Sequence, residues 1–223
     1  FFLFLVIATN SFAQPRDLYP ILHDYAKGLY DEYKSIPEDR RFRLEAIADY
    51  IRNRKHEGKI AEVLFIGTNQ TTRSLMVQAW ARAAAHYYGF DEGEYFSGGI
   101  NDGPVSTNTI QALERAGFIV YKVKEGRQDF YQVKYSYNLK PLLLYPKKID
   151  DRQNPPKDFM AVLVCQNAAE NLRVVDGTFN RIELVYNDPF GFEGSEEEER
   201  RYDDVCRQIA LEIFYLFSKL KHV

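Results

Sequence analysis

Two unbroken apolar runs constrain the fold of this chain most. "EVLFIG" at residues 62–67 and "FMAVLVC" at residues 159–165 lack the polar alternation of a half-exposed strand. Such runs are typical of strands buried on both faces, as in a parallel sheet covered by helices. Helical patterns at residues 74–88 and 105–116 alternate with strand patterns. This order predicts an α/β fold, an open parallel sheet with helices on both faces.

Further segments extend this pattern. "EYFSGG" at residues 94–99, "GFIVYKV" at 117–123 and "RIELVYND" at 181–188 are the other strand candidates. "FYQVKYSY" and "KPLLLYP" within residues 130–146 fit either a hairpin or an addition at a sheet edge, because the second is short and ends in proline. Ser195 is predicted to cap a long amphipathic final helix.

The N-terminal region divides into two parts before the main domain. Residues 1–13 have the apolar block and small residues of a signal peptide remnant, which predicts a bacterial periplasmic or secreted protein. Residues 14–57 read as a helical extension, a hairpin in which "SIPE" at residues 35–38 caps the second helix. Residues 58–223 then form the α/β domain. A buried N-terminal helix is the alternative for residues 1–7, which are apolar on every side.

Composition limits the partners. The chain has 223 residues and a formal charge of -3, with acids and bases interspersed, so we expect one core and no nucleic-acid partner. The apolar N-terminal block is too short to span a bilayer in the mature chain. The two cysteines, Cys165 and Cys206, and the scattered histidines lack metal-ligand spacing, so we expect no metal and no cofactor.

One strand-to-helix turn has the layout of an anion site. The first strand is expected to end at Ile66, which leaves residues 67–72 as a turn before the helix. Backbone amides of such a turn and the positive helix end converge on one point. Arg73 would clamp two oxygens of a phosphate-like group, and Ser74 would hydrogen-bond into the loop. Small polar residues are also common in strand-to-helix turns, so an ordinary turn without a role in anion binding remains an alternative.

"GTNQTTRS" at residues 67–74 resembles the C-x5-R-[ST] loop of low-molecular-weight protein tyrosine phosphatases and the related arsenate reductases. "FSGG", "ALERAGF", "AVLVCQNAAENL" and "YNDPF" resemble further family segments, in the family's own order. The resemblance covers about residues 61–220 and implies the fold of that family, to which the helical extension would be an addition. It also implies a phosphate-like oxyanion or a phosphorylated molecule as ligand.

The resemblance implies three catalytic roles, and this chain lacks the residue for one of them. Family members attack phosphorus or arsenic with a cysteine thiolate, and here that position is Gly67. Arg73 would hold the equatorial oxygens, and Asp188 would protonate the leaving oxygen. The implied oxyanion-binding loop consists of Thr68, Asn69, Gln70, Thr71, Thr72, Arg73 and Ser74.

Other departures weaken the enzymatic interpretation. Arsenate reductases with internal disulfides use a second cysteine seven positions after the first; here Cys165 is followed at that distance by Leu172. Asn69 and Gln70 replace the usual small residue and asparagine, which alters the expected loop shape. The loop threonines are poor nucleophiles because no histidine or lysine lies nearby in sequence to act as a base.

Three hypotheses follow from these residues. The first is a pseudoenzyme that keeps the oxyanion loop and has lost its nucleophile at Gly67. The second is an active phosphatase or arsenate-reductase-like enzyme with an unrecognised mechanism that depends on Asp188. The third is an interaction domain with a relic loop and a protein partner that the sequence does not identify.

Overall fold

The structure is a computed structural model that describes residues 17–69, 71–101, 103–124, 129–192 and 194–220. The predicted signal peptide remnant, residues 1–13, therefore lies outside the described residues.

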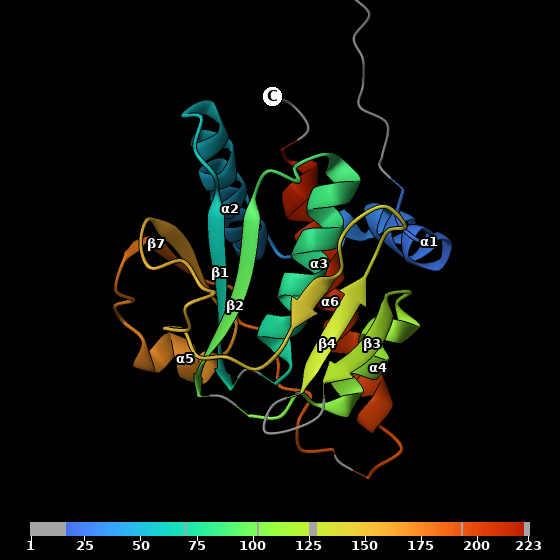
Figure 1. The fold of residues 1–223 in the computed structure, drawn as a ribbon. Helices are drawn as coiled ribbons and strands as arrows, with labels where there is room; N and C mark the ends of the chain where they lie inside the picture. Colours follow the sequence, from blue (N-terminus) through green and yellow to red (C-terminus); the bar gives the residue numbers. More distant parts are fainter. Residues whose placement is uncertain (1–16, 70, 102, 125–128, 193, 221–223) are drawn as a thin grey trace, which may run out of the picture.

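A four-stranded parallel sheet forms the centre of the molecule, with strand order β2-β1-β6-β7 (Figure 1). Its strands are β1 (Glu62–Asn69), β2 (Glu94–Asn101), β6 (Phe159–Leu163) and β7 (Thr178–Glu183). The apolar runs of β1 and β6 pair with each other in the middle, where every residue of β6 is buried. The prediction that these two runs are central parallel strands is confirmed.

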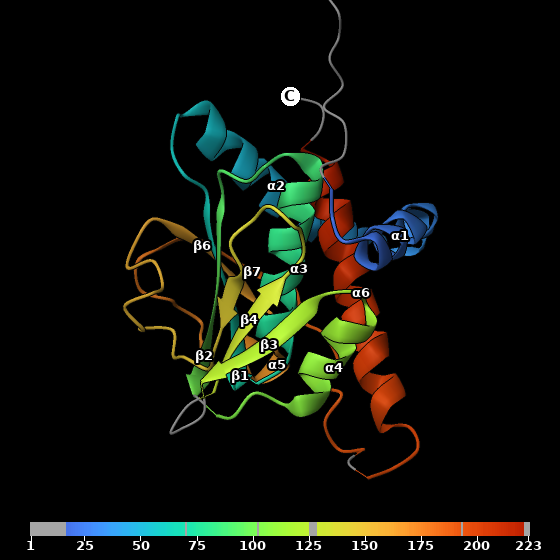
Figure 2. The ribbon, with the colours of Figure 1, turned by 45° about the vertical axis from the view of Figure 1, so that its right-hand side comes forward.

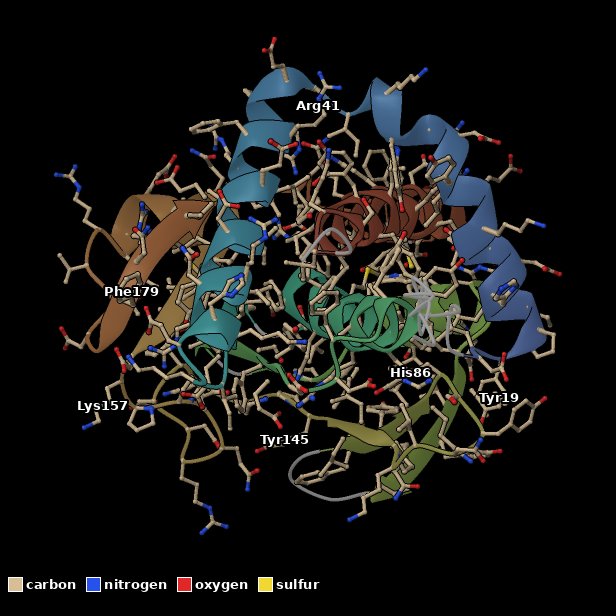
Figure 3. All side chains as sticks on the ribbon, turned by 90° about the horizontal axis from the view of Figure 1, so that it is seen from above. Tyr19, Arg41, His86, Tyr145, Lys157 and Phe179 are labelled. Atoms are coloured by element: carbon tan, nitrogen blue, oxygen red, sulfur yellow. The ribbon has the colours of Figure 1, made fainter. Side chains whose placement is uncertain are left out.

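Helices flank this sheet, as the α/β pattern predicts. They are α3 (Arg73–Tyr88), α4 (Thr107–Arg115), α5 (Gln166–Asn171) and α6 (Glu198–Ser218). Seen from above in Figure 3, α3 and α6 lie side by side in the middle of the molecule. Their facing surfaces meet around Trp80, Phe214 and Cys206, all of which are buried. This packing fixes the start of α3 relative to the sheet.

A second sheet of three antiparallel strands lies beside the first (Figure 2). It consists of β3 (Ile119–Lys124), β4 (Phe130–Lys134) and β5 (Leu142–Leu144). The hairpin alternative for β4 and β5 is thus the one observed. β3 was expected in the parallel sheet, and that prediction is wrong. The side chains of Ile119, Tyr121 and Val123 are exposed, so this strand lacks the two-sided burial of a central parallel strand.

The N-terminal extension is helical, as predicted, and packs on α6. It comprises α1 (Pro20–Leu29), the 3-10 turn η1 (Tyr30–Ser35) and α2 (Glu38–His56). In Figure 3 these helices lie on the outer side of α3 and α6. The predicted cap at Ser35 is wrong: Pro37 is the N-cap, and the Ser35 hydroxyl donates instead to the carbonyl of Glu32 at 2.7 Å.

The predicted cap of the final helix is wrong for the same reason. α6 begins at Glu198 after Glu197, and the Ser195 hydroxyl donates to the carbonyl of Phe192 at 2.6 Å. A nearby turn carbonyl therefore competes successfully for a hydroxyl that sequence spacing assigns to a helix end. Across the described part of the chain, no helix combines the length and apolar character needed to cross a membrane.

Candidate functional site

A cavity of about 970 Å³ opens at the carboxyl edge of the parallel sheet, the lower edge in Figure 1. Residues that follow each of the four strands line it. The lining includes Thr68 and Asn69 at the end of β1, Thr71, Thr72 and Arg73 after it, Gly103–Ser106 after β2, Cys165–Asn167 after β6, and Val185–Asp188 with Phe190 after β7. This is the edge at which open parallel sheets bind ligands.

The first strand is longer than predicted. β1 continues through Asn69, because Gly67 pairs with Gly99 and Asn69 pairs with Asn101 of β2. The side-chain amide of Asn101 also donates to Asn69 Oδ1 at 3.3 Å. Only residues 70–72 therefore separate the strand from α3, which is a shorter turn than the expected one at residues 67–72. Gln70, one of the predicted loop residues, lies outside the described residues.

Thr71 fixes the turn against the neighbouring helix. Its carbonyl accepts hydrogen bonds from the N–H of Ser106 at 3.2 Å and from the hydroxyl of Thr109 at 3.1 Å, both near the start of α4. Its own N–H donates to the carbonyl of Asn69 at 2.9 Å. The Thr71 amide is thus turned away from a ligand. The polar donors that remain for an anion come mainly from the start of α3 and from Arg73.

Arg73 is the cation of the site and is the first residue of α3. Its side chain is only 12% exposed, and Nη1 donates to the carbonyl of Tyr186 at 3.1 Å. Nη2 forms an ion pair with Asp188 Oδ2. The structure therefore brings Arg73 and Asp188 together, 115 residues apart in sequence, as the family resemblance implies.

Asp188 lies at the mouth of the cavity. Its side chain is 53% exposed, and Oδ1 accepts the N–H of Phe190 at 3.2 Å. Because Asp188 already occupies the Arg73 guanidinium, an incoming anion must displace one carboxylate oxygen from it. A displaced carboxyl group would stay within reach of a leaving oxygen, which is the position that a general acid requires.

The segment that carries Asp188 is held from behind by the N-terminal extension. Arg40 of α2 donates to the carbonyl of Val185 at 2.9 Å, and its guanidinium lies 5.1 Å from the centre of the Tyr186 ring. Arg40 also binds both carboxylate oxygens of Glu212 on α6, at 2.6 and 2.7 Å. The extension is thus connected to the site, although sequence reasoning treated it as an addition without chemistry.

Gly67 borders a small space where a side chain would lie. A Cβ atom built there would be 3.2 Å from Ser74 Oγ, 3.3 Å from the carbonyl oxygen of Asn69 and 3.4 Å from Cys165 Sγ. Ser74 is fully buried, and its hydroxyl has no hydrogen-bond partner among the described residues. The predicted hydrogen bond from Ser74 into the loop is therefore absent from the described part of the chain.

Cys165 is the residue that sequence reasoning missed. It lies just beyond the end of β6, after Val164, and lines the cavity that Thr68 and Arg73 also line. Burial raises the pKa of its thiol above the ordinary value, whereas the charge of Arg73 and hydrogen bonds from the backbone and side chain of Thr68 act to lower it; Asp188 raises it again. Because Cys165 comes just after a buried strand that pairs with β1, the predicted topology alone could have placed it here.

The two cysteines do not form a disulfide. Cys165 and Cys206 are both free and buried. Cys206 lies in the core, where it accepts a hydrogen bond from the Trp80 indole at 3.3 Å, and burial raises its pKa to about 12. Among the described residues, no group of three or more histidine, cysteine, aspartate or glutamate side chains could hold a metal ion.

Solved structures similar to this chain include phosphatases and arsenate reductases. A mutant of YwlE from Bacillus subtilis is 14% identical with a TM-score of 0.46, over 72% of this chain and 99% of that chain. The low-molecular-weight protein tyrosine phosphatase of T. tengcongensis is 17% identical with a TM-score of 0.47, over 72% and 99%. The arsenate reductase of Archaeoglobus fulgidus is 19% identical with a TM-score of 0.43, over 70% and 98%.

The chain is similar to these proteins in fold. No protein-family profile and no curated protein sequence matches the chain.

Proposed function

We propose that this protein binds a phosphate-like oxyanion, free or as part of a phosphorylated molecule, and that position 67 contributes no nucleophile. The observation that carries the proposal is the pairing of Arg73 with Asp188 in a cavity at the carboxyl edge of the sheet. A guanidinium that is 12% exposed and faces a cavity is well placed to bind two oxygens of a tetrahedral anion.

Three further features support this proposal. Arg73 begins a helix of 16 residues, so the helix end adds free N–H groups and a partial positive charge. Ser74 keeps a buried hydroxyl that has no partner among the described residues, and an anion oxygen would satisfy it. Gly67 offers no side-chain atom for covalent catalysis, so the covalent step of the resembling family has no group at this position.

Titration calorimetry with inorganic phosphate, arsenate and sulfate tests the proposal. The wild-type chain should bind phosphate, and Arg73→Ala should weaken binding by roughly 10-fold or more, since a hydrogen bond to a charged group contributes about 1.5–3 kcal/mol. Arg115→Ala is the matched control. Arg115 is also an arginine paired with an aspartate, Asp203 at 2.8 Å, but it does not line the cavity.

Binding that is absent in the wild type, or equal in wild type and Arg73→Ala, would contradict the proposal. Equal losses in Arg73→Ala and Arg115→Ala would also contradict it, because they would point to a general charge effect. Circular dichroism of each variant separates loss of binding from loss of folding.

A further inference from the structure

Sulfur is missing at position 67 but not from the site. The thiol of Cys165, just beyond the end of β6, lies 3.4 Å from the point where the Cβ atom of a residue at position 67 would be. The two strands are hydrogen-bonded neighbours at this edge, with Val164 N–H donating to the carbonyl of Ile66 at 2.9 Å. A glycine at position 67 leaves the space in front of this sulfur open.

We propose that Cys165 is the nucleophile of this site and that the protein is a slow phosphomonoesterase. The inference rests on the proposed oxyanion site, to which it adds a reaction. Cys165 has the chemistry for the role because a thiol is the best nucleophile among the uncharged side chains, and it lines the same cavity as Arg73 and Asp188.

Cys165, Arg73 and Asp188 lie at three different depths in the cavity. Cys165 is 2% exposed and lies at the bottom, the Arg73 side chain is 12% exposed, and the Asp188 side chain is 53% exposed at the mouth. A phosphoryl group held by Arg73 would have the sulfur on its inner side and the leaving oxygen on its outer side, near Asp188. Displacement at phosphorus requires this in-line arrangement.

Two hydroxyl groups are placed to assist the sulfur. Thr68 hydrogen-bonds Cys165 through its backbone and its side chain. Ser74 Oγ faces the same space over Gly67, is fully buried and has no partner among the described residues. Ser74 can therefore donate to a phosphoryl oxygen or to the thiolate. Both contacts stabilise negative charge at the place where it develops.

The reaction balances in two steps. The thiol proton passes to a non-bridging phosphoryl oxygen, the sulfur attacks phosphorus, the S–P bond forms, and the P–O bond to the leaving group breaks. The protonated carboxyl group of Asp188 gives its proton to the leaving oxygen. Water then loses a proton to the Asp188 carboxylate and attacks phosphorus, so that the S–P bond breaks. Phosphate leaves, and the sulfur regains a proton from it.

Turnover of p-nitrophenyl phosphate by the full chain tests the proposal, together with mass spectrometry of acid-quenched protein. The wild type should release p-nitrophenol above the buffer rate and carry one phosphoryl group on the peptide that contains Cys165. Cys165→Ser should lose both signals and still bind inorganic phosphate. Cys206→Ala is the matched control, because Cys206 lies in the core outside the cavity, and it should keep both signals.

Alkylation of the thiols provides a second readout. Iodoacetate, an anionic alkylating agent, should modify Cys165 before Cys206, and inorganic phosphate should protect it.

The outcomes separate this inference from the proposed function. Phosphate binding without turnover or adduct, or turnover unchanged in Cys165→Ser, would overturn the role of Cys165 and leave oxyanion binding in place. Absence of phosphate binding by the wild type would overturn both. Loss of turnover in Cys165→Ser with phosphate binding retained would support both.

Discussion

At the scale of single residues, Gly67, Ser74 and Cys165 surround one small space. A side chain at position 67 would contact Ser74 Oγ at 3.2 Å and Cys165 Sγ at 3.4 Å from its Cβ atom. These two contacts are to side-chain atoms, and the third, at 3.3 Å, is to the backbone carbonyl oxygen of Asn69, so each neighbour must shift by a few tenths of an ångström. Substitution at Gly67 is therefore compatible with folding and changes the chemistry of the site directly.

Gly67→Cys should form a disulfide with Cys165 in the absence of reductant. The new Cβ atom would lie 3.4 Å from Cys165 Sγ, which suits the separation across a disulfide. Counting free thiols in denatured protein, with and without reductant, measures this bond. Gly67→Cys with Cys165→Ser is the control, and it should show no intramolecular disulfide. If air-exposed Gly67→Cys has two free thiols in addition to that of Cys206, the expected disulfide has not formed and the prediction is wrong.

Asp188→Asn should tighten phosphate binding several-fold. Asp188 pairs with Arg73, so an anion must displace this carboxylate and then lie close to its charge. The neutral amide removes the competition for Arg73 and the repulsion between the carboxylate and the anion. Removal of one exposed charge should change the free energy of binding by on the order of 1 kcal/mol. Calorimetry measures the affinity, and Asp203→Asn, which removes the partner of Arg115, serves as control. Weaker binding by Asp188→Asn than by the wild type would show that Asp188 does not compete for Arg73.

At the scale of elements, one buried ion pair connects the N-terminal extension to the site. Arg40 of α2 binds Glu212 of α6 and the carbonyl of Val185, in the segment that leads to Asp188. The Glu212 side chain is only 3% exposed and that of Arg40 17%. Neither charge can be left alone at such depth without a large cost.

Arg40→Met should therefore lower the free energy of unfolding by about 3–5 kcal/mol, because Glu212 stays buried without its partner. Arg40→Met with Glu212→Leu should recover most of this loss. Urea unfolding followed by circular dichroism measures both variants. A double variant that is less stable than Arg40→Met would show that the extension depends on the charges themselves rather than on their pairing.

The elements that the sequence predicts correctly are those whose local pattern is decisive. β1 and β6 were predicted because their apolar runs match burial on both faces, and Arg73 and Asp188 meet because both follow strands of one parallel sheet. The end of β1 at Asn69 depends on pairing with Asn101, which no local pattern encodes. The contact of Cys165 with the space over Gly67 likewise depends on side-chain packing between neighbouring strands.

At the scale of the whole molecule, a buried lysine links stability to pH. Lys147 lies where the segment after the small sheet crosses β2, with its carbonyl accepting the N–H of Gly99 at 3.0 Å. The residue is 5% exposed, and burial lowers the pKa of its amine to about 8 from the ordinary 10.5. The unfolded chain therefore binds more protons than the folded one between these two values, so stability increases with pH there.

Between pH 8 and about 9.5, the free energy of unfolding should rise by up to about 1.4 kcal/mol per pH unit through Lys147. Above that range, ionisation of tyrosines in the unfolded chain opposes the rise, because burial raises the pKa of tyrosines such as Tyr88 to about 12 in the folded protein. Urea unfolding at several pH values measures the slope. Lys147→Met should flatten it, and Lys148→Met, at the exposed neighbouring position, should not.

The extension and the α/β domain share one hydrophobic core, so they should not separate as folding units. Leu22, Leu29, Leu44 and Ile47 of the extension are fully buried in the same cluster as Trp80 of α3 and Phe214 of α6. Burial of one such side chain contributes about 1.5–3 kcal/mol to the free energy of folding.

A chain of residues 58–223 would expose the surface of α6 that these four side chains cover, and we expect it to aggregate or to unfold. Gel filtration and circular dichroism measure this, with a chain of residues 17–223 as control. A monomeric, cooperatively unfolding 58–223 chain would show that the extension is dispensable, and that the contact of Arg40 with Val185 is not needed to hold the Asp188 segment.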